Sequence, residues 1–280
     1  MSAIGLDQIL AATRQRVELA RRSADLIELR ELAQQHLPRG FRAALESKSR
    51  NGGVAVIAEL KKASPSKGLI RADFPVAQFA TELEAAEATA LSILTDAQFF
   101  QGSLENLRLA SRATSLPCLR KDFILDEFQL LEARAHCADA VLLIVAALSD
   151  AELRTLAAHA RELNLDVLCE IHDEAELAPA LDAGCNLIGV NSRNLKTFQV
   201  DPETPFRLAP RIPKNVLAVA ESGIGSGDEL CRLSGVGYQA FLIGESLMRA
   251  EHPGAALRKI IADCKALTTT AAGNRQCSRF

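Results

Sequence analysis

The 280-residue chain has no tryptophan and only one tyrosine, Tyr238. Single-stranded nucleic acids are bound largely by stacking of bases on aromatic side chains, so this scarcity argues against a nucleic-acid platform. The formal net charge of −3 also argues against a basic nucleic-acid surface. No apolar run reaches the roughly 18 residues of a membrane span. We therefore expect neither nucleic acid nor a membrane as a partner.

The sequence also lacks any C-x-x-C pair. Its seven cysteines are scattered singly, at Cys118, Cys137, Cys169, Cys185, Cys231, Cys264 and Cys277. An odd number of cysteines in mostly apolar surroundings indicates buried reduced thiols rather than disulfides or metal ligands. The first ten residues carry Asp7 and no basic-then-apolar signal pattern. We therefore expect a cytoplasmic protein without a bound metal.

What the chain does contain is a regular alternation of short apolar runs and helical patterns. The runs predict strands at Val54–Leu60, Ala90–Leu94, Pro117–Lys121, Ala140–Ile144, Asp166–Ile171, Leu187–Val190, Leu217–Ala220 and Ala240–Ile243. Successive runs begin roughly 20–35 residues apart, about the length of one βα unit. Eight such units predict a closed (β/α)8 TIM barrel, with parallel strands and right-handed crossovers. A doubly wound open sheet is the alternative, but no G-x-G-x-x-G follows the first strand.

Additional segments precede and follow the predicted barrel. Amphipathic patterns predict N-terminal helices over 6–22 and 23–35, and a short helical turn over 41–45. A last helix is predicted from Pro253 to about Leu267, because residues 268–280 are polar and without period. We therefore predict one domain over residues 1–267 and a flexible tail over residues 268–280.

Charged and polar side chains gather where the predicted strands end. They are Glu59, Lys61, Arg120, Lys121, Glu170, Asn191, Arg193, Glu221 and Glu245. The carboxyl ends of all strands in a (β/α)8 barrel meet at one mouth, which carries the active site. A packed core would not place charges there without partners. Charged ends on six strands therefore favour an active site over incidental surface charge.

The first strand and the loop after it illustrate this pattern. Glu59 and Lys61 are two residues apart, so both side chains point to the same face of a strand. Ser64 to Gly68 then change abruptly to serine, proline, lysine and glycine, which predicts a loop. The loop is a candidate for movement over the mouth. Taken alone, the pair is equally compatible with a strand that simply runs out into solvent.

Lys121 and Glu170 are the candidates for acid–base chemistry. Desolvation and nearby ammonium groups lower a lysine pKa whereas facing carboxylates raise it, so the sequence leaves the state of Lys121 open, and a structural salt bridge remains the alternative role. Glu170 ends the apolar run Val167–Cys169, so burial is expected to raise its pKa. His172 follows as a loop residue with no second histidine at metal spacing, which argues against metal binding.

Glycine-containing turns follow the last two strands. Ser222 and Gly223 come directly after the seventh strand, and Gly244 comes directly after the eighth. Glycine lets a backbone approach a phosphate closely, and barrels commonly bind phosphate after these two strands. These turns therefore predict a phosphate site, which Ser64 could complete. For either loop alone, a simple chain reversal is the alternative.

Phenylalanines follow the second and third strands. Phe99, Phe100 and Phe123 fall at the predicted mouth, where together they could clamp a flat substrate. Each of them alone is more often a core residue than a ligand contact.

These strand-end residues resemble those of the indole-3-glycerol-phosphate synthase family. The matching segments occur in family order and cover nearly all of the chain to about residue 267: Ile57–Gly68, Leu91–Asp96, Phe99–Ser103, Leu119–Phe123, Gly189–Phe198, Val219–Ile224 and Leu242–Met248. Blocks 61–66 and 191–195 are the specific ones, and the additional N-terminal helices fit the family as well. The last residues, from Cys277 to Phe280, match nothing in it.

The resemblance implies a carboxy-lyase of tryptophan biosynthesis. Such an enzyme closes the indole ring of 1-(2-carboxyphenylamino)-1-deoxyribulose 5-phosphate with loss of carbon dioxide and water, and it needs no cofactor. We expect the chain to act as a monomer on this small phosphorylated substrate. The resemblance makes Lys121 the acid at the ribulose carbonyl, with Glu170, Lys61 and Glu59 as candidates for the dehydration. How these three divide the work stays open.

The remaining roles implied by the resemblance concern substrate binding. Asn191 and Glu221 would orient the anthranilate amine and the ribulose hydroxyls, and Arg193 would face the substrate carboxylate. Phe100 and Phe123 would hold the aromatic ring, and the glycine-containing turns with Ser64 would hold the phosphate.

Two other functions remain open from the residues themselves. The same barrel could be a Schiff-base aldolase with Lys121 as the nucleophile, which borohydride trapping would reveal. It could also be a phosphate-binding barrel that senses or binds a partner without catalysis. The presence of Glu59, Lys61, Lys121 and Glu170 argues against the latter.

Overall fold

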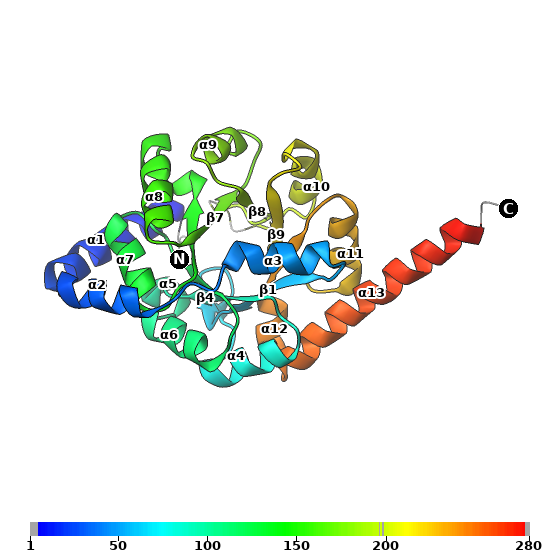
Figure 1. Ribbon diagram of the computed structural model, residues 1–280, viewed down its shortest axis with the longest axis horizontal. Coiled ribbons are helices and arrows are strands. Elements are labelled where there is room, and N and C mark those ends of the chain that lie inside the picture. The colour runs from blue at the N-terminus through cyan, green and yellow to red at the C-terminus, as the bar shows by residue number, and fades with distance from the viewer. Residues whose placement is uncertain (1–4, 196, 198, 278–280) are drawn as a thin grey trace.

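A computed structural model of the protein (Figure 1) describes residues 5–195, 197 and 199–277. Eight parallel strands close into a barrel in the order β1-β10-β9-β8-β7-β6-β5-β4, which confirms the predicted (β/α)8 fold. The strands are β1 (Ala55–Leu60), β4 (Ala90–Leu94), β5 (Cys118–Lys121), β6 (Ala140–Ile144), β7 (Asp166–Ile171), β8 (Leu187–Asn191), β9 (Leu217–Glu221) and β10 (Ala240–Ile243). Each bound lies within one residue of the prediction.

The first strand closes the barrel by pairing on both sides. Ala55 of β1 is in register with Ala240 of β10, and Ile57 is in register with Ala90 of β4. All six residues of β1 are buried, because the barrel interior covers one face and helices cover the other. This double coverage explains why the strands read as continuous apolar runs instead of alternating ones.

Helices follow the strands and pack around the barrel. They are α4 (Val76–Ala85), α6 (Leu104–Ala113), α7 (Glu127–Ala135), α8 (Asp150–Glu162), α9 (Leu177–Asp182), α10 (Thr204–Leu208) and α11 (Gly227–Gly235). Shorter turns are α5 (Ala97–Phe100), α12 (Glu245–Arg249), η1 (Val145–Ala147) and η2 (Ala209–Arg211). Local hydrogen bonds fix where the helices begin. At the start of α8, for example, Ser149 and Glu152 form a capping box. The helix α6 was not expected from the sequence; it begins after Ser103, whose side chain accepts a hydrogen bond from the Asn106 N–H.

The N-terminal extension consists of α1 (Leu6–Ser23), α2 (Leu26–Gln35) and α3 (Phe41–Arg50). Figure 1 shows α3 crossing one end of the barrel. Its residues Phe41 and Leu45 are fully buried and belong to the same apolar cluster as the first residues of several strands. The sequence indicated only a turn at 41–45, and the structure instead has a complete helix to Arg50. The other end of the barrel faces α1, so the extension passes from one end to the other.

Asp139 fastens this extension to the barrel just before β6. Its Oδ2 accepts hydrogen bonds from Arg39 Nη2 at 2.6 Å and Nε at 3.0 Å, and from the Cys118 N–H at 2.7 Å. His36 Nε2 lies 3.0 Å from Oδ1. The Asp139 side chain is fully buried, so these partners compensate a charge that would otherwise be costly.

Two further segments differ from a simple βα repeat. The loop after β1 folds into a hairpin of β2 (Ala63–Ser64) and β3 (Gly68–Leu69). The last helix, α13 (Pro253–Cys277), projects beyond the barrel in Figure 1. Its predicted end near Leu267 was wrong, because no proline interrupts the following residues. Residues 278–280 of the predicted tail lie outside the described residues.

Among the helices of the described ranges, none is long and apolar enough to cross a membrane.

Candidate active site

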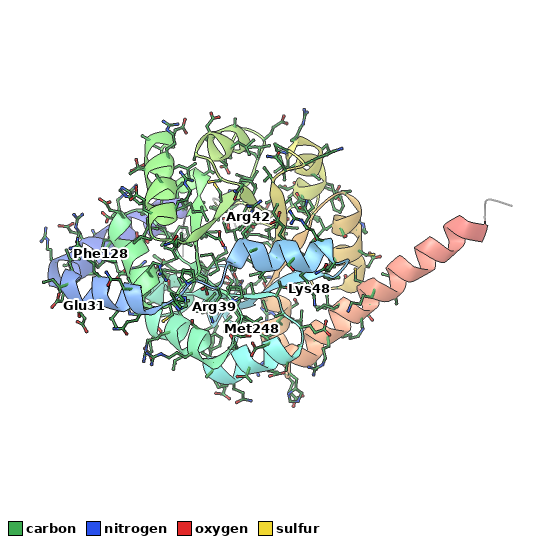
Figure 2. All side chains as sticks on the ribbon, viewed as in Figure 1. Glu31, Arg39, Arg42, Lys48, Phe128 and Met248 are labelled. Carbon is green, nitrogen blue, oxygen red and sulfur yellow. The ribbon has the colours of Figure 1, made fainter. Side chains whose placement is uncertain are left out.

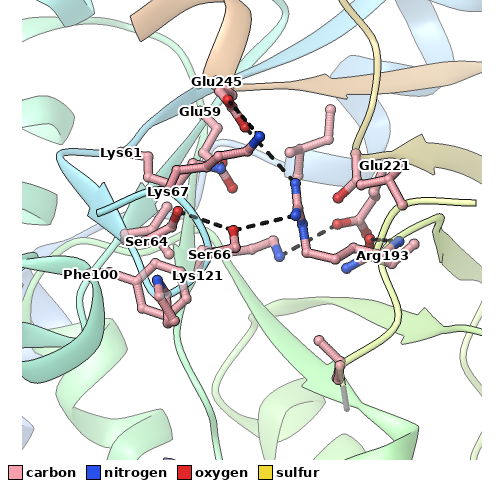
Figure 3. A pocket seen from close by; sticks show the side chains of 18 of the residues that line it. Glu59, Lys61, Ser64, Ser66, Lys67, Phe100, Lys121, Arg193, Glu221 and Glu245 are labelled. Carbon is pink, nitrogen blue, oxygen red and sulfur yellow. Dashed lines mark hydrogen bonds and ion pairs between the residues drawn. The ribbon is translucent and has the colours of Figure 1, made fainter. Parts of the chain in front are cut away.

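A cavity of about 870 Å³ opens at the carboxyl ends of the strands (Figure 3). The structure places all the predicted site residues in its lining: Glu59, Lys61, Ser64, Phe100, Lys121, Phe123, Glu170, Asn191, Arg193, Glu221, Ser222, Gly223 and Gly244. Phe99, which the sequence also suggested, is not part of that lining. Parallel strands bring these residues together because each one ends at the same rim.

The side chain of Lys121 lies at the centre of the charged floor. Its Nζ is 3.1 Å from Glu170 Oε2 and 3.5 Å from Glu221 Oε2. Figure 3 shows it extending from β5 beneath the hairpin. The preceding residue, Arg120, is not part of the cavity lining and pairs with Asp122 at 3.0 Å and with Glu132 at 3.3 Å. Period-two alternation along β5 therefore separates the residue facing the cavity from its neighbour.

The carboxylates around Lys121 determine its charge. Burial alone would lower the pKa of Lys121, but Glu170, Glu221 and Glu59 together hold it above its ordinary value. The lysine is therefore an ammonium ion in the unliganded site. An ammonium ion can donate a proton or pair with an anion, but it cannot act as a nucleophile until it loses a proton.

Glu170 differs from the sequence-based expectation. Burial does raise its pKa, but Lys121 and His172 outweigh burial and hold the pKa below its ordinary value. The expectation considered only desolvation and could not include the cations that the fold brings to the carboxylate. At Glu221 the balance is reversed. Burial and the neighbouring Glu170 raise the pKa of Glu221 to about 8, although Lys121 lowers it. The two glutamates thus differ in protonation state near neutral pH.

Glu59 and Lys61 face each other as the strand geometry predicted. Lys61 Nζ donates to Glu59 Oε2 at 2.5 Å, and Glu59 is almost fully buried. Gly244 at the end of β10 leaves room for this carboxylate, since a Cβ there would overlap Glu59 Oε2. A glycine first interpreted as a phosphate ligand therefore also makes space for the neighbouring acid.

The end of the cavity over β9 and β10 is suited to an anion. Ser222 and Gly223 have φ of +63° and +78°, which turns the backbone sharply after Glu221. A side chain at Gly223 would be strained by this φ and would meet Val200. The hairpin contributes Ser64, which is buried and lines the same cavity.

The hairpin is held over this end by Arg193 and Glu245. Arg193 Nη1 donates to Ser66 Oγ at 3.3 Å, and Glu245 lies 3.9 Å from both Lys67 Nζ and Arg193 Nη2 (Figure 3). These long contacts between partly exposed groups are weak. They connect the hairpin to the rim of the cavity on the side of β8 and β10.

The opposite end of the cavity is apolar. The Phe100 and Phe123 rings have centroids 6.5 Å apart and planes tilted by 41°. Leu6 and Ile9 of α1 also contribute to the lining. The sequence did not identify these two residues as part of the site, although they belong to the apolar face of the first helix.

His172 is the other residue whose role the sequence did not reveal. It follows β7, and its Nε2 lies 3.3 Å from Glu170 Oε1. The only sequence signal was its position two residues after a strand-end glutamate, which predicts that both side chains point to the same side. Within the part of the chain that the structure describes, no cluster of histidine, cysteine or acidic residues is arranged to hold a metal ion.

Comparison with known structures finds other barrels. The chain superposes on thiamine phosphate pyrophosphorylase from Pyrococcus furiosus with a TM-score of 0.58 and 17% identity, covering 78% of this chain and 98% of that one. It superposes on 3-hexulose-6-phosphate synthase from Salmonella typhimurium with a TM-score of 0.60 and 13% identity, covering 75% and 97%. At such low identities these likenesses establish the fold alone.

Sequence comparison is far more specific. An indole-3-glycerol phosphate synthase from Koribacter versatilis (strain Ellin345) is 58% identical over 256 residues, covering 91% of this chain and 98% of that protein. The protein of the same name from Bordetella pertussis is 47% identical, covering 92% and 98%. The family model for indole-3-glycerol phosphate synthase matches residues 6–260. The chain therefore belongs to the indole-3-glycerol phosphate synthase family.

Proposed function

We propose that the chain converts 1-(2-carboxyphenylamino)-1-deoxyribulose 5-phosphate into indole-3-glycerol phosphate, carbon dioxide and water. The observation that carries this assignment is the Lys121 ammonium held between Glu170 and Glu221 on the floor of a cavity with one apolar and one anion-suited end. The substrate has the same three parts, which are an aromatic acid, a ribulose carbonyl and a phosphate.

Ring closure requires an acid at the ribulose carbonyl. The aromatic carbon that bears the carboxylate attacks this carbonyl, and its oxygen becomes a hydroxyl by taking a proton. Lys121 is the donor, because it is an ammonium ion at the centre of the floor. Loss of carbon dioxide then returns the electrons of the broken carbon–carbon bond to the ring.

The dehydration step requires both an acid and a base. The new hydroxyl leaves as water after a second protonation, and the neighbouring ribulose methylene loses a proton to complete the indole. Lys61 and Lys121 are the available cations, and Glu59 and Glu170 are the available carboxylates. Glu59 is paired with Lys61 on one wall and Glu170 is paired with Lys121 on the floor, so each acid has a base beside it.

Binding uses the two ends of the cavity. Phe100 and Phe123 hold the anthranilate ring, and Arg193 faces its carboxylate. Asn191 and Glu221 orient the amine and the ribulose hydroxyls. The phosphate lies against Ser64, Ser222, Gly223 and Gly244, where backbone N–H groups and a hydroxyl can donate to it.

The acid and base groups of the proposed chemistry, Lys61, Lys121, Glu59 and Glu170, all line one cavity. We propose that these side chains supply the acid–base chemistry without a cofactor, and that the enzyme acts as a monomer in the cytoplasm. Gel filtration with light scattering tests the monomer, and activity after exhaustive dialysis against a chelator tests the independence from metal.

The decisive experiment is turnover of the proposed substrate by the purified protein, followed by indole fluorescence and by carbon dioxide release. Appearance of both products in equal amounts supports the assignment. Absence of indole formation under conditions in which the phosphate substrate binds would overturn it.

A further inference from the structure

His172 and Glu176 extend the charged floor toward the surface. Glu176 Oε2 lies 3.2 Å from His172 Nδ1 and accepts the His172 backbone N–H at 2.7 Å. The other ring nitrogen, Nε2, is 3.3 Å from Glu170 Oε1. Glu170 in turn presents its second oxygen, Oε2, to Lys121 Nζ at 3.1 Å. Three contacts of about one hydrogen-bond length therefore join Lys121 to Glu176.

The exposure of these groups increases along the same path. The Glu170 side chain is 1% exposed, His172 is 13% exposed and Glu176 is 17% exposed. Asp173 points elsewhere, because its Oδ1 accepts the N–H groups of Ala175 and Glu176. The path thus begins at a group in contact with solvent and passes through the enclosed Glu170 to Lys121, whose 13% exposure is toward the cavity that the substrate fills.

The proposed reaction consumes a proton in each turnover. The ribulose oxygen takes up two protons as it changes from carbonyl to hydroxyl to departing water. The ribulose methylene gives one proton back, and the carboxylate leaves as neutral carbon dioxide without contributing any. One proton per turnover must therefore enter a site that the substrate itself fills, and a side-chain path from solvent would deliver it.

We propose that Glu176 and His172 form the proton-entry path of the active site, recharging Lys121 through Glu170 after each turnover. This inference rests on the proposed function. When Lys121 has given its proton to the substrate, Glu170 no longer faces a cation and accepts the Nε2 proton of the His172 imidazolium at Oε1. Rotation of the carboxyl group then brings this proton to the Lys121 amine, which restores the ammonium and the carboxylate. The neutral ring keeps its proton on Nδ1, so a half-turn of the ring presents the bare nitrogen to Glu176 Oε2, which delivers a proton from solvent, and no bond other than those to hydrogen changes.

The geometry suits a relay because each member faces its two neighbours with different atoms. The His172 ring faces Glu170 with Nε2 and Glu176 with Nδ1, and Glu170 faces the ring with Oε1 and Lys121 with Oε2. The Nε2 contact has the distance of an ion pair without the alignment of a hydrogen bond, so the ring must rotate slightly for transfer. Burial would lower the pKa of His172, but Glu170 and Glu176 together raise it to about 10, so the resting ring carries the proton to be delivered.

The test compares His172→Gln with the wild-type enzyme and with His159→Gln. Glutamine keeps the bulk and one hydrogen bond but cannot relay a proton between two nitrogens. His159 is a matched control, because it is also paired with a glutamate, Glu127 at 2.8 Å, but this glutamate is not part of the cavity lining, whereas the partner of His172, Glu170, is. Circular dichroism and thermal melting establish that each variant is folded, and Glu176→Gln provides a second interruption of the path at its exposed end.

We expect H172Q to lose on the order of a hundredfold in kcat with little change in KM, and H159Q to retain wild-type kcat. Added imidazole should restore kcat of H172Q in proportion to its concentration, and the solvent deuterium isotope effect on kcat should rise. E176Q should show a smaller loss of the same kind. A purely structural role for His172 would give a loss without rescue.

The proposal is overturned if H172Q and E176Q both keep the kcat of H159Q. It is equally overturned if their losses are insensitive to imidazole and leave the isotope effect unchanged. Failure of the proposed function is a separate result, because the wild-type enzyme itself would then form no indole.

Discussion

Gly189 of β8 lies directly against the carboxylate of Glu221 on the neighbouring strand β9. A Cβ at position 189 would overlap Glu221 Oε1 and would also crowd Leu168 on the other side. Glu221 is fully enclosed, and its other oxygen faces Lys121 at 3.5 Å. The absence of a side chain at 189 is therefore what lets the glutamate occupy the floor of the cavity.

Gly189→Ala should accordingly displace Glu221 and lower kcat. Orientation errors of about 1 Å cost catalysts on the order of a hundredfold, so a loss of ten- to a hundredfold is expected. Steady-state kinetics measures it. Gly235→Ala is the matched control, since a Cβ at Gly235 would meet nothing within 4 Å. Equal kcat values for the two variants would contradict this role of Gly189.

Lys121→Ala should lose at least about a hundredfold in kcat, the usual contribution of a general acid. Binding of the phosphorylated substrate should persist, because the phosphate end of the cavity does not involve Lys121. Calorimetric titration measures binding and indole fluorescence measures turnover. Lys259→Ala removes an exposed lysine that is paired with Asp263 and should change neither. Retention of activity in K121A would refute the assigned role.

Borohydride treatment in the presence of substrate should leave Lys121 unmodified. The surrounding carboxylates keep this lysine protonated, and a protonated amine forms no Schiff base. Intact-mass spectrometry followed by peptide mapping detects any reduced adduct. A substrate-dependent adduct on Lys121 would favour the aldolase alternative over ring closure.

His172→Gln should destabilise the protein most at low pH. The folded-state pKa of His172, about 10, lies above its ordinary value of 6.5. Its stabilising contribution is therefore complete below pH 6.5 and is lost as the pH rises through 10. Urea unfolding midpoints of the wild type and H172Q should converge between pH 6.5 and 10. A difference that is constant or grows over this range would contradict the assigned charge.

Asp139→Asn should cost about 3 kcal/mol of unfolding free energy, because it leaves Arg39 without its buried counter-ion. The urea midpoint measures this loss, and activity at low denaturant should persist. Asp263→Asn breaks an exposed ion pair with Lys259 and should change stability by less than about 1 kcal/mol. Similar midpoints for the two variants would show that Asp139 does not anchor the N-terminal helices.

The sequence predicted the barrel strands more accurately than the helix ends and the segments before and after the barrel. Each strand is an apolar run bounded by polar turns, so burial on both faces leaves a local trace in the sequence. The helix over 41–50 and the continuation of α13 past Leu267 have weaker sequence patterns. Phe41 and Leu45 become core residues only because the barrel provides a surface to cover.

The site shows the same division between local and tertiary information. Residue types at strand ends are local, so the set from Glu59 to Gly244 could be read from the order of strands once a barrel was inferred. The protonation states could not be predicted from the sequence, because the pKa values of Glu170 and Glu221 depend on which charges the closed barrel brings near them. Burial acts on both carboxylates, and the position of Lys121 and His172 separates them.

By itself, the sequence determined the eight-strand alternation, the family and the chemical groups available at the mouth, because these follow from local periodicity and residue type. Only the tertiary structure decided that Glu170 is paired on both oxygens, that glycines make room for Glu59 and Glu221, and that His172 links the floor to solvent. Electrostatic energies depend on distance and burial, and both arise only when strands remote in sequence meet at one rim.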